Sequence, residues 1–349
     1  MKKRLLVVTT VHHPDDNRIR EKTIRSLEPD FEITYAARLP GPSDVSGLVW
    51  QPLPGGRLRR NVRAWRVAWS GSFDSVSLHD PELIPLGLAL SGARRAGVVF
   101  DVHEDIPAQI MTKAWVPRVV RKPLAAGVRV LLRLAERSMI LTMAESSYGA
   151  VFAREHPVIS NYPDTSGLPK AAGGEGAVYV GDVTEERGLV DAVVACGKAE
   201  VPLTVVGPYR PEIREAMEAA ASRAGTHLVM TGRLPHHRAM AVVASAAVAI
   251  SPLRDIPNYR YSIPTKVLEY LAVGVPVAAS DLPATRALVD GLEAVELHDP
   301  GDPADLARAI RLLLPPEVGA AARAQADDVR KRFRWPSGEL RRLYRMAVR

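Results

Sequence analysis

The sequence has little of what several large classes of protein require. It contains a single cysteine, Cys196, which excludes an internal disulfide and a cysteine-rich zinc cluster. No apolar run reaches the roughly 18 residues that cross a bilayer. No GxGxxG follows any predicted strand, which argues against a nicotinamide oxidoreductase. No close histidine pair has the spacing of zinc ligands, so we expect no metal. A metal held with the help of nearby carboxylates stays open as an alternative without direct support; these are Asp80, Glu82, Asp101, Glu104 and Asp105.

The composition that is present is typical of a globular protein with more than one domain. Apolar residues make up 47% of the 349 residues and charged residues 24%, and this length fits two domains better than one. The apolar start, Leu5 to Val8, runs into polar residues without a cleavage site, so it predicts a first strand and a cytoplasmic protein. The net charge of +7 favours an anionic partner or simply reflects arginine-rich composition. Nothing else points to nucleic acid, and we expect none.

Short apolar runs alternate with helical patterns along the whole chain. This βαβ alternation predicts an α/β protein with two doubly wound parallel sheets. The predicted strands are 5–10, 32–37, 74–79, 98–103, 139–143 and 158–161, then 177–181, 203–207, 227–232, 248–251, 276–280 and 294–297. A Gly-, Ala- and Pro-rich stretch at 165–176 separates the two series. The predicted domains are therefore 1–165 and 177–334, followed by a C-terminal helical segment, 335–349, that packs back on the first domain.

Ligands of open α/β sheets bind beyond the carboxyl ends of the strands. Polar residues follow several predicted strands in each of the two series. If the two domains face each other, these two sets of residues would line an interdomain cleft. In the first series they include four histidines, each able to donate a hydrogen bond or act as an acid or base. These histidines are His12, His13, His79 and His103. An isolated strand-end histidine is also a common loop residue, so this signal is weak for each one taken separately.

The densest signal lies near the start of a predicted helix at Thr265. A helix N-terminus favours phosphate, Lys266 adds a positive charge in the first turn, and Glu269 offers two acceptor oxygens to a sugar diol. An ordinary capped helix with an exposed lysine and glutamate is the alternative. Arg187, after the predicted strand 177–181, either reaches the same diphosphate or pairs with a neighbouring glutamate.

The stretch 115–137 is apolar and carries six basic residues but one acid, Glu136. Basic amphipathic helices of this kind lie on anionic membranes. A helix packed on its own sheet with its arginines in water is the alternative. The pattern leaves open a peripheral contact with the inner face of the membrane.

The segment 264–281 is similar to a family signature, P-x-K-x-x-E-Y-x-A-x-G-x-P-V-x-x-x-D. With the turn 179–189 and weaker N-terminal motifs at 14–20, 79–82 and 101–104, the chain resembles retaining glycosyltransferases of family 4, which have the GT-B fold. The resemblance implies transfer of a sugar from a nucleotide-diphosphate sugar to an acceptor hydroxyl, with retention and without metal or cofactor. The acceptor is a small molecule or a lipid-linked one.

The resemblance also implies roles for individual residues. His103, Arg187 and Lys266 match positions near the transferred sugar and the diphosphate. The expected donor-binding residues are Gly181, Arg187, Gly188, Gly232, Arg233, Leu234, Tyr261, Ser262, Ile263, Pro264, Thr265, Lys266 and Glu269. The acceptor-side candidates are His12, His13, Asp16, His79, Asp80 and Glu104.

Three departures from the family pattern keep other functions open. Tyr261 stands where the family has its first signature glutamate, and Asp182 stands where a basic residue often follows the strand-end glycine. The usual glycine-rich N-terminal loop is replaced by residues 11–16. The alternatives are a nucleotide-sugar epimerase or a pseudo-glycosyltransferase of the same fold, and a binding protein without activity.

Overall fold

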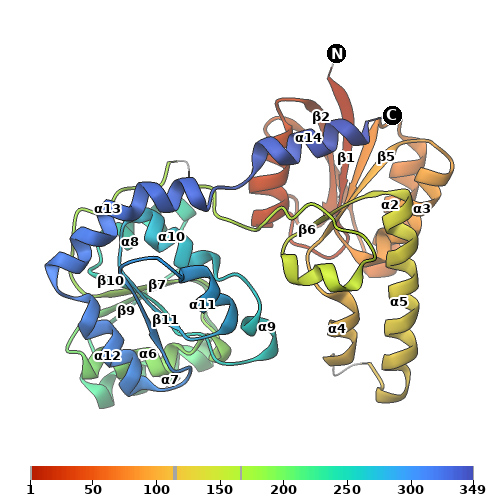
Figure 1. Ribbon diagram of the computed structural model, residues 1–349. Coiled ribbons are helices and arrows are strands. Elements are labelled where there is room, and N and C mark those ends of the chain that lie inside the picture. The colour runs from red at the N-terminus through yellow and green to blue at the C-terminus, as the bar shows by residue number, and fades with distance from the viewer. Residues whose placement is uncertain (1, 113–115, 166, 349) are drawn as a thin grey trace. The chain divides into compact units, whose positions relative to one another are not determined.

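The computed structural model describes residues 2–112, 116–165 and 167–348, which form two compact units. The first consists of Met1–Asn161 together with Trp335–Arg349, and the second of Tyr162–Arg334 (Figure 1). The glycine-rich stretch 165–176 thus belongs to the second unit. Its residues Leu168 and Ala171 are buried in the core of that unit, so apolar side chains pack this stretch against the second unit despite its loop-like composition.

The first unit contains a parallel sheet of six strands in the order β3-β2-β1-β4-β5-β6. The strands are β1 (Lys3–Val8), β2 (Phe31–Arg38), β3 (Leu48–Leu53), β4 (Ser75–Leu78), β5 (Gly97–Val102) and β6 (Ile140–Met143). The order reverses between β1 and β4, which are hydrogen-bonded neighbours. Such a reversal is the point of a doubly wound sheet at which ligands bind.

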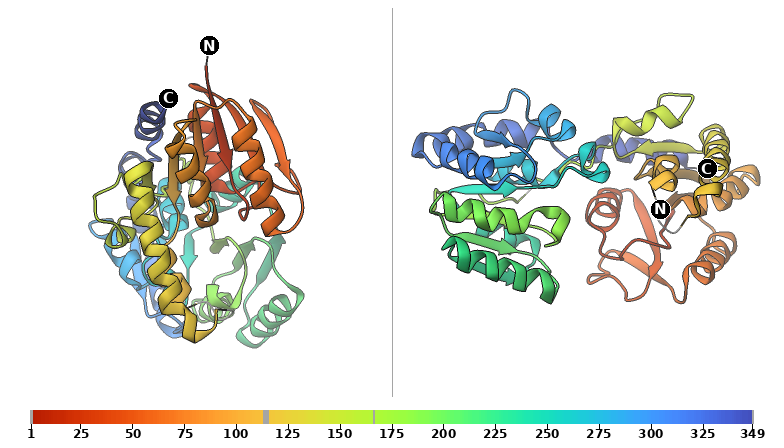
Figure 2. Two further views of the ribbon diagram at one scale, coloured as in Figure 1. Left: turned by 90° about the vertical axis from the view of Figure 1, so that its right-hand side faces the viewer. Right: turned by 90° about the horizontal axis from the view of Figure 1, so that it is seen from below.

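Helices cover both faces of this sheet. Three of them lie along one face, α2 (Arg57–Ser70), α3 (Ile84–Gly92) and α5 (Arg118–Ser138), as the left view of Figure 2 shows. The other face is covered by η1 (Asn17–Ile24), α1 (Arg25–Leu27) and α14 (Ser337–Ala347). The remaining short elements are η2 (Pro81–Leu83), α4 (Ile106–Thr112) and η3 (Ser146–Val151).

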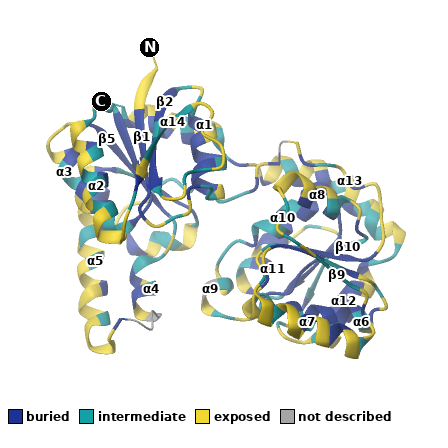
Figure 3. Cartoon of the chain, turned by 180° about the vertical axis from the view of Figure 1, so that it is seen from behind, coloured by how far each residue is buried: buried dark blue, intermediate teal, exposed yellow. Residues whose placement is uncertain are grey.

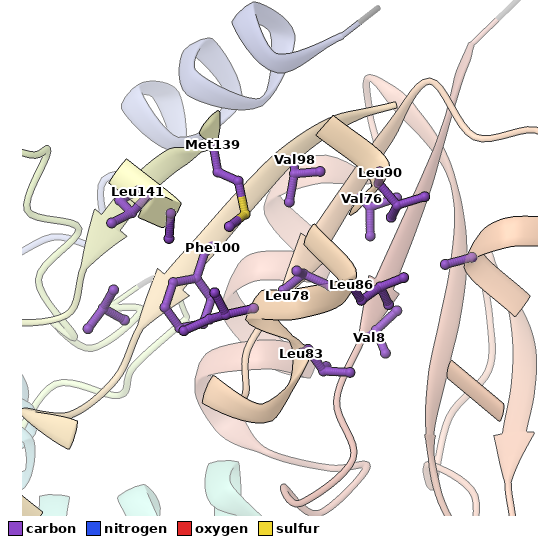
Figure 4. Packing of buried hydrophobic residues seen from close by; sticks show 14 of the residues in the cluster. Val8, Val76, Leu78, Leu83, Leu86, Leu90, Val98, Phe100, Met139 and Leu141 are labelled. Carbon is purple, nitrogen blue, oxygen red and sulfur yellow. The ribbon is translucent and has the colours of Figure 1, made fainter. Parts of the chain in front are cut away.

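The core beneath α2, α3 and α5 is made of aliphatic side chains around Phe100 (Figure 4). Leu83, Leu86 and Leu90 of the η2–α3 segment lie against Val76 and Leu78 of β4. These central strands are buried on both faces, which explains their continuous apolar runs. Packing of this kind fixes the ends of β4 and β5, where the polar residues of interest begin.

The sequence-based strand assignments were wrong at two places in the first unit. Strand β3 was not predicted because it is an edge strand, with Val49 53% exposed and Pro52 near its end, so it lacks a continuous apolar run. The segment 158–161, predicted as a strand, forms only an isolated bridge between Val158 and Met143. An apolar run that leads out of a unit resembles a strand in sequence because it too is buried, as Ile159 is.

The second unit repeats the architecture with a parallel sheet in the order β12-β11-β10-β7-β8-β9. Its strands are β7 (Ala177–Val180), β8 (Leu203–Val206), β9 (Leu228–Gly232), β10 (Val248–Ser251), β11 (Val277–Ser280) and β12 (Val295–His298). Its helices are η4 (Glu185–Arg187), α6 (Leu189–Lys198), α7 (Pro211–Ala224), α8 (His236–Ala244), α9 (Pro257–Arg260), α10 (Thr265–Val273), α11 (Pro283–Val289), α12 (Pro303–Leu313) and α13 (Pro316–Arg332). The α/β fold with two doubly wound parallel sheets is thereby confirmed. None of the described helices is both long and apolar enough to cross a membrane.

Candidate functional site

In the second unit, the strand order reverses between β10 and β7, which pair with each other. The turn after β7 and helix α10, which follows β10, therefore flank the switch point of this sheet. Backbone geometry shapes the turn. Gly181 has φ +145°, and a Cβ there would lie 2.8 Å from Nζ of Lys266. Gly188 has φ +69°, and a Cβ there would lie 2.0 Å from the carbonyl oxygen of Pro252. Only glycine fits at these two positions.

Lys266, in the first turn of α10, extends over the end of β7. Its ammonium group donates a hydrogen bond of 2.8 Å to the hydroxyl of Tyr179 and lies 4.0 Å from the centre of that ring. Burial, and next the nearby charge of Arg187, lowers the pKa of Lys266 well below its ordinary range. An anion bound beside this ammonium would reverse that effect and favour the charged form.

Arg187 lies at the end of η4, on the other side of the same turn. Its guanidinium stacks on Tyr259 of α9, 4.8 Å from the ring centre. The sequence left open an ion pair with Glu185 or Glu186, and no such pair forms between these described residues. Across the described part of the chain, no carboxylate forms a salt bridge with either Arg187 or Lys266. Two basic side chains that lack an acidic partner among the described residues, at the switch point, are suited to bind an anion, which would also favour the charged form of Lys266.

Glu269 lies one turn beyond Lys266 in α10. Its Oε1 lies 3.1 Å from Nε2 of His236, at the start of α8, and its side chain is 17% exposed. One carboxylate oxygen is therefore oriented by the histidine, while the second is available to a ligand hydroxyl. His236 was not among the predicted residues, because its position at a helix start gives no chemical signal in the sequence.

The other residues predicted to bind the donor differ in their position and exposure. Gly232 ends β9 and accepts a hydrogen bond from the backbone of Gly207, at the end of β8. Arg233 is exposed, and Leu234 is half-buried against the core. Ser262, Ile263, Pro264 and Thr265 form the approach to α10, and Pro264 caps the helix without a side-chain hydrogen bond. Tyr261 is 62% exposed, so it forms part of the outer edge of this group.

In the first unit, the loop after β1 meets the end of β4 at the switch point. Asp80 is buried and accepts hydrogen bonds from the hydroxyl of Thr9, at 2.9 Å, and from the backbone of Thr10, at 2.5 Å. His12 lies 2.9 Å from the other carboxylate oxygen through Nδ1. Burial raises the pKa of Asp80, but the hydrogen bond and charge of His12 outweigh it and lower that pKa to about 2. Burial lowers the pKa of His12, but the hydrogen bond and charge of Asp80 outweigh burial and raise that pKa above its ordinary value.

A second network lies beside the first, at the end of β5. Arg18 holds both oxygens of the buried Asp101, at 2.9 and 2.8 Å. His103 lies 2.9 Å from Asp101 and 3.2 Å from His79. The rings of His12 and His103 are 5.0 Å apart, so the two networks are contiguous. Thr142 donates to Asp101 as well.

Burial governs the protonation states in this second network. Burial raises the pKa of Asp101, but Arg18 and His103 outweigh it and hold that pKa well below its usual value. Burial lowers the pKa of His79, and the neighbouring His103 adds to the effect. The network thus contains an ionised Asp101 and a neutral His79 at neutral pH.

His79, Asp101 and His103 also offer three ligand atoms that all lie within 4.8 Å of one another. Three such atoms are the minimum for a catalytic metal site. However, both oxygens of Asp101 already accept from the Arg18 guanidinium, and a metal ion would lie beside that positive charge. The chemistry of this donor set fits a hydrogen-bonded network better than a metal site.

Three acceptor-side candidates lie outside the networks. His13 is exposed, and its Nδ1 accepts from the backbone of Asp15. Asp16 caps η1 by accepting from the backbone of Ile19, at 3.0 Å. Glu104 is exposed and follows β5. The sequence gives the same strand-end signal for these residues as for His12 and Asp80, and only the path of the loops separates them.

Several residues that shape the two sites were missed by sequence reasoning. In the first unit they are Thr9, Thr10, Arg18 and Thr142, and in the second they are Tyr179, His236 and Tyr259. Tyr179 lies two residues before a strand-end glycine, so the strand-end rule could have found it. Arg18 could not be found in this way, because it pairs with Asp101 across 83 residues of sequence.

Comparison with known proteins shows that the chain is similar to glycosyltransferases. Residues 175–315 match the family model described as Glycosyl transferases group 1. The chain is 25% identical over 339 residues to the phosphatidyl-myo-inositol mannosyltransferase of Mycobacterium leprae, covering 90% of this chain and 84% of the relative. The protein is a glycosyltransferase. The family match contains the Gly181 turn, Arg187, Lys266 and Glu269.

Solved structures share the architecture of this glycosyltransferase. The sucrose-phosphate synthase of Thermosynechococcus elongatus superposes with a TM-score of 0.76 at 16% identity, covering 99% of both chains. Anabaena HepE, in complex with UDP and glucose, superposes with a TM-score of 0.72 at 13% identity, covering 99% of this chain and 98% of the other. At such identities the likeness concerns the fold, which is GT-B.

Proposed function

We propose that this glycosyltransferase moves a sugar from a nucleotide-diphosphate sugar to an acceptor hydroxyl, with retention of anomeric configuration and without a metal ion. The observation that carries the proposal is the pair of cations at the switch point of the second sheet, Lys266 and Arg187. Neither has an acidic partner among the described residues, and Lys266 is held by Tyr179. A diphosphate supplies the missing negative charge.

The proposed binding mode follows from the surrounding groups. The diphosphate lies over the Gly181 turn, where the absence of a side chain leaves room beside Nζ of Lys266. Glu269, oriented by His236, accepts hydrogen bonds from the ribose diol. The base lies toward Gly232, Arg233 and Leu234. HepE, whose structure contains UDP and glucose, supports a nucleotide sugar as the donor.

The chemical step is rupture of the bond between the anomeric carbon and the diphosphate oxygen. Negative charge grows on the leaving diphosphate as this bond breaks. Lys266, Arg187 and the N-terminus of α10 stabilise that charge, which is the role that a divalent cation has in metal-dependent transfer. Retention is supported by the resemblance of the segment 264–281 to family 4, and the acceptor hydroxyl then attacks on the face from which the diphosphate leaves.

The first unit supplies candidates for the acceptor side. His12 and Asp80, and His103 and Asp101, are hydrogen-bonded pairs at strand ends. Each pair can orient a sugar hydroxyl or receive a proton. We propose that His103 orients the transferred sugar and that the acceptor is a small molecule or a lipid-linked one. The mannosyltransferase relative carries phosphatidyl-myo-inositol in its name, which supports a lipid-linked acceptor.

The test begins with the donor. Thermal-shift measurements against a panel of nucleoside diphosphates and their sugars should identify a ligand that stabilises the protein. Lys266→Ala and Glu269→Ala should then lower donor turnover by about a hundredfold, the size typical for loss of one stabilising donor group. Lys170→Ala is the matched control, since Lys170 is 72% exposed and pairs with Asp327 at the surface.

The outcomes separate the alternatives that the sequence leaves open. Unchanged turnover in both site variants would show that the diphosphate binds elsewhere. Conversion of donor alone into an isomeric nucleotide sugar would identify an epimerase. Activity that survives a chelator and gives a product with the donor's anomeric configuration, read by NMR, is the expected result. Loss of activity on chelation would contradict transfer without a metal ion.

A further inference from the structure

The outer side of α5 has an unusual surface for a helix of a globular protein. Its residues Val119 and Val130 are 86% and 61% exposed, and Leu134 is 44% exposed. Exposed Pro123 and Ala126 lie between them. The spacings of four, three, four and four residues place all five on one side of the helix. We call these five residues the α5 stripe, and Figure 3 shows the exposed side of this helix in yellow.

The α5 stripe faces away from the core of the first unit because the opposite side of the helix is the one that packs. Ala125, Leu132 and Ala135 of that side are buried. Leu132 and Ala135 belong to the main core of the unit. Ala125 belongs to a small separate cluster with Ile110 and Val116. The helix therefore has two apolar sides, of which the fold uses one.

A row of basic residues runs beside the stripe. Arg118, Lys122, Arg129 and Arg133 each precede a residue of the stripe directly, so they lie on one adjoining side of the helix. Among the described residues, only Arg133 of these four has an acidic partner, Glu136 at 3.8 Å. Glu136 is the only acid in α5 and is buried, so the solvent side of this helix presents cations alone.

Apolar residues beside unpaired cations on one helix are complementary to an anionic lipid surface. Valine and leucine enter the boundary between headgroups and acyl chains, and the flanking basic side chains contact the phosphates. Six basic residues, as in α5, prevent a helix from spanning the bilayer, and an amphipathic helix of this kind lies in the plane of the interface.

The same unit contains a second basic helix with exposed apolar residues, which makes a natural comparison. Helix α2 exposes Leu58 at 80% and Val62 at 54%. Three of its five arginines are engaged within the unit, however. Arg57 pairs with Glu82, and Arg60 and Arg63 donate to the backbone carbonyls of Gly55 and Pro54. Those cations are less available to a membrane than the ones on α5.

We propose that α5 docks this glycosyltransferase on an anionic membrane, with the α5 stripe inserted in the interface and the basic row on the phosphates. Residue 115, at the start of the sequence-based range 115–137, lies outside the described residues, and the proposal rests on α5 alone. Membrane docking does not depend on the donor site, so its failure would leave the proposed sugar transfer untouched.

The test is flotation of the full chain with two kinds of vesicle, phosphatidylcholine alone and an equimolar mixture with phosphatidylglycerol. The protein should float with the mixed vesicles and not with the neutral ones, and added salt should weaken the binding. The double variant Val119→Glu with Val130→Glu should lose binding. Arg118→Gln with Arg129→Gln should weaken it about 25-fold, since each cation near such a surface contributes about fivefold.

The matched control is Leu58→Glu with Val62→Glu on α2, which should float like the unaltered protein. All variants should show the same thermal shift with the nucleoside diphosphate found for the donor site, because the changed side chains are exposed and lie in the other unit. Failure of the unaltered protein to bind mixed vesicles would overturn the proposal. Equal loss of vesicle binding in the α2 control would also overturn it. A dimer in sedimentation that disappears in the Val119→Glu, Val130→Glu variant would overturn it too, because a second copy of the chain would then cover the α5 stripe.

Discussion

At the scale of single residues, two buried carboxylates of the first unit, Asp80 and Asp101, each accept hydrogen bonds from several partners. Asp80 accepts from Thr9, Thr10 and His12, and Asp101 accepts from Arg18 on both oxygens. Buried carboxylates remain ionised only when such partners outweigh the loss of water. Loss of one partner would therefore leave a buried charge uncompensated, which destabilises a protein strongly.

Asp80 should make the stability of the protein fall in acid. Its pKa is about 2 in the folded chain and 3.8 in its ordinary state. A lowered folded pKa means stability that is present above pH 3.8 and is lost as the pH falls through about 2, amounting to about 2 kcal/mol. Unfolding by urea at a series of pH values should show a steeper loss below pH 4 for the unaltered protein than for Asp80→Asn. Parallel curves would contradict the assignment.

Removal of Arg18 should destabilise the protein strongly. Arg18→Met leaves the buried Asp101 carboxylate without its main partner, at a cost of about 3–5 kcal/mol. Arg25→Met is the control, because Arg25 is 55% exposed and forms a surface pair with Glu21, which contributes less than about 1 kcal/mol. Denaturant unfolding compares the two. Similar midpoints for both variants would show that the Arg18–Asp101 pair adds nothing to stability.

At the scale of elements, the donor site is assembled from loops that follow strands, and glycine sets their paths. Gly188 connects η4 to α6 in the left-handed region and lies against Pro252, which follows β10. This contact brings the turn after β7 against the loop after β10. Arg187, which the same turn carries, is positioned by that contact and by Tyr259.

Gly188→Ala should therefore destabilise the protein more than an equivalent change at a turn without such a contact. Gly225 is the control, since it ends α7 at φ +67° and a Cβ added there would meet no described atom within 4 Å. Gly225→Ala should cost about 1 kcal/mol from backbone strain alone. Gly188→Ala adds the overlap with Pro252 and should lower both the melting temperature and donor affinity. Equal melting temperatures and unchanged donor affinity would contradict the assigned role of the Gly188 turn.

At the scale of the whole molecule, the chain leaves the first unit once and returns to it. Residues 335–349 are assigned to that unit, where Leu340, Leu343 and Tyr344 of α14 are buried. Tyr344 also forms a hydrogen bond of 2.5 Å with Ser77 of β4. The second unit is thus inserted in the sequence of the first, and it contains all of the proposed donor residues.

Separate production of the two units should reveal this insertion. Residues 162–334 should unfold cooperatively on heating and bind the nucleoside diphosphate. Residues 1–161 alone should not unfold cooperatively, because three lost apolar side chains of α14 contribute about 2 kcal/mol each, a large part of the stability of a domain. Joining 335–349 to residues 1–161 through a flexible linker should restore a cooperative transition by circular dichroism. Equal transitions with and without α14 would contradict the prediction.

The sequence by itself determined the α/β architecture, the two series of parallel strands and the residues at the start of α10. Central strands are buried on both faces, so their apolar runs are readable, and the signature 264–281 is local in sequence. The strand-end rule also found His12, His79, Asp80 and His103. It could not separate them from His13, Asp16 and Glu104, because the direction of a loop side chain depends on the path of the loop.

Only the tertiary structure decided which charges have partners. Arg18 meets Asp101 across 83 residues of sequence, and Lys266 meets Tyr179 across 87. Such pairs depend on the order of strands in the sheet, which no local pattern encodes. The edge strand β3 was missed because its exposure depends on what packs against it. The apolar and basic character of α5 was readable in the sequence, but only the packing shows which of its apolar side chains remain exposed.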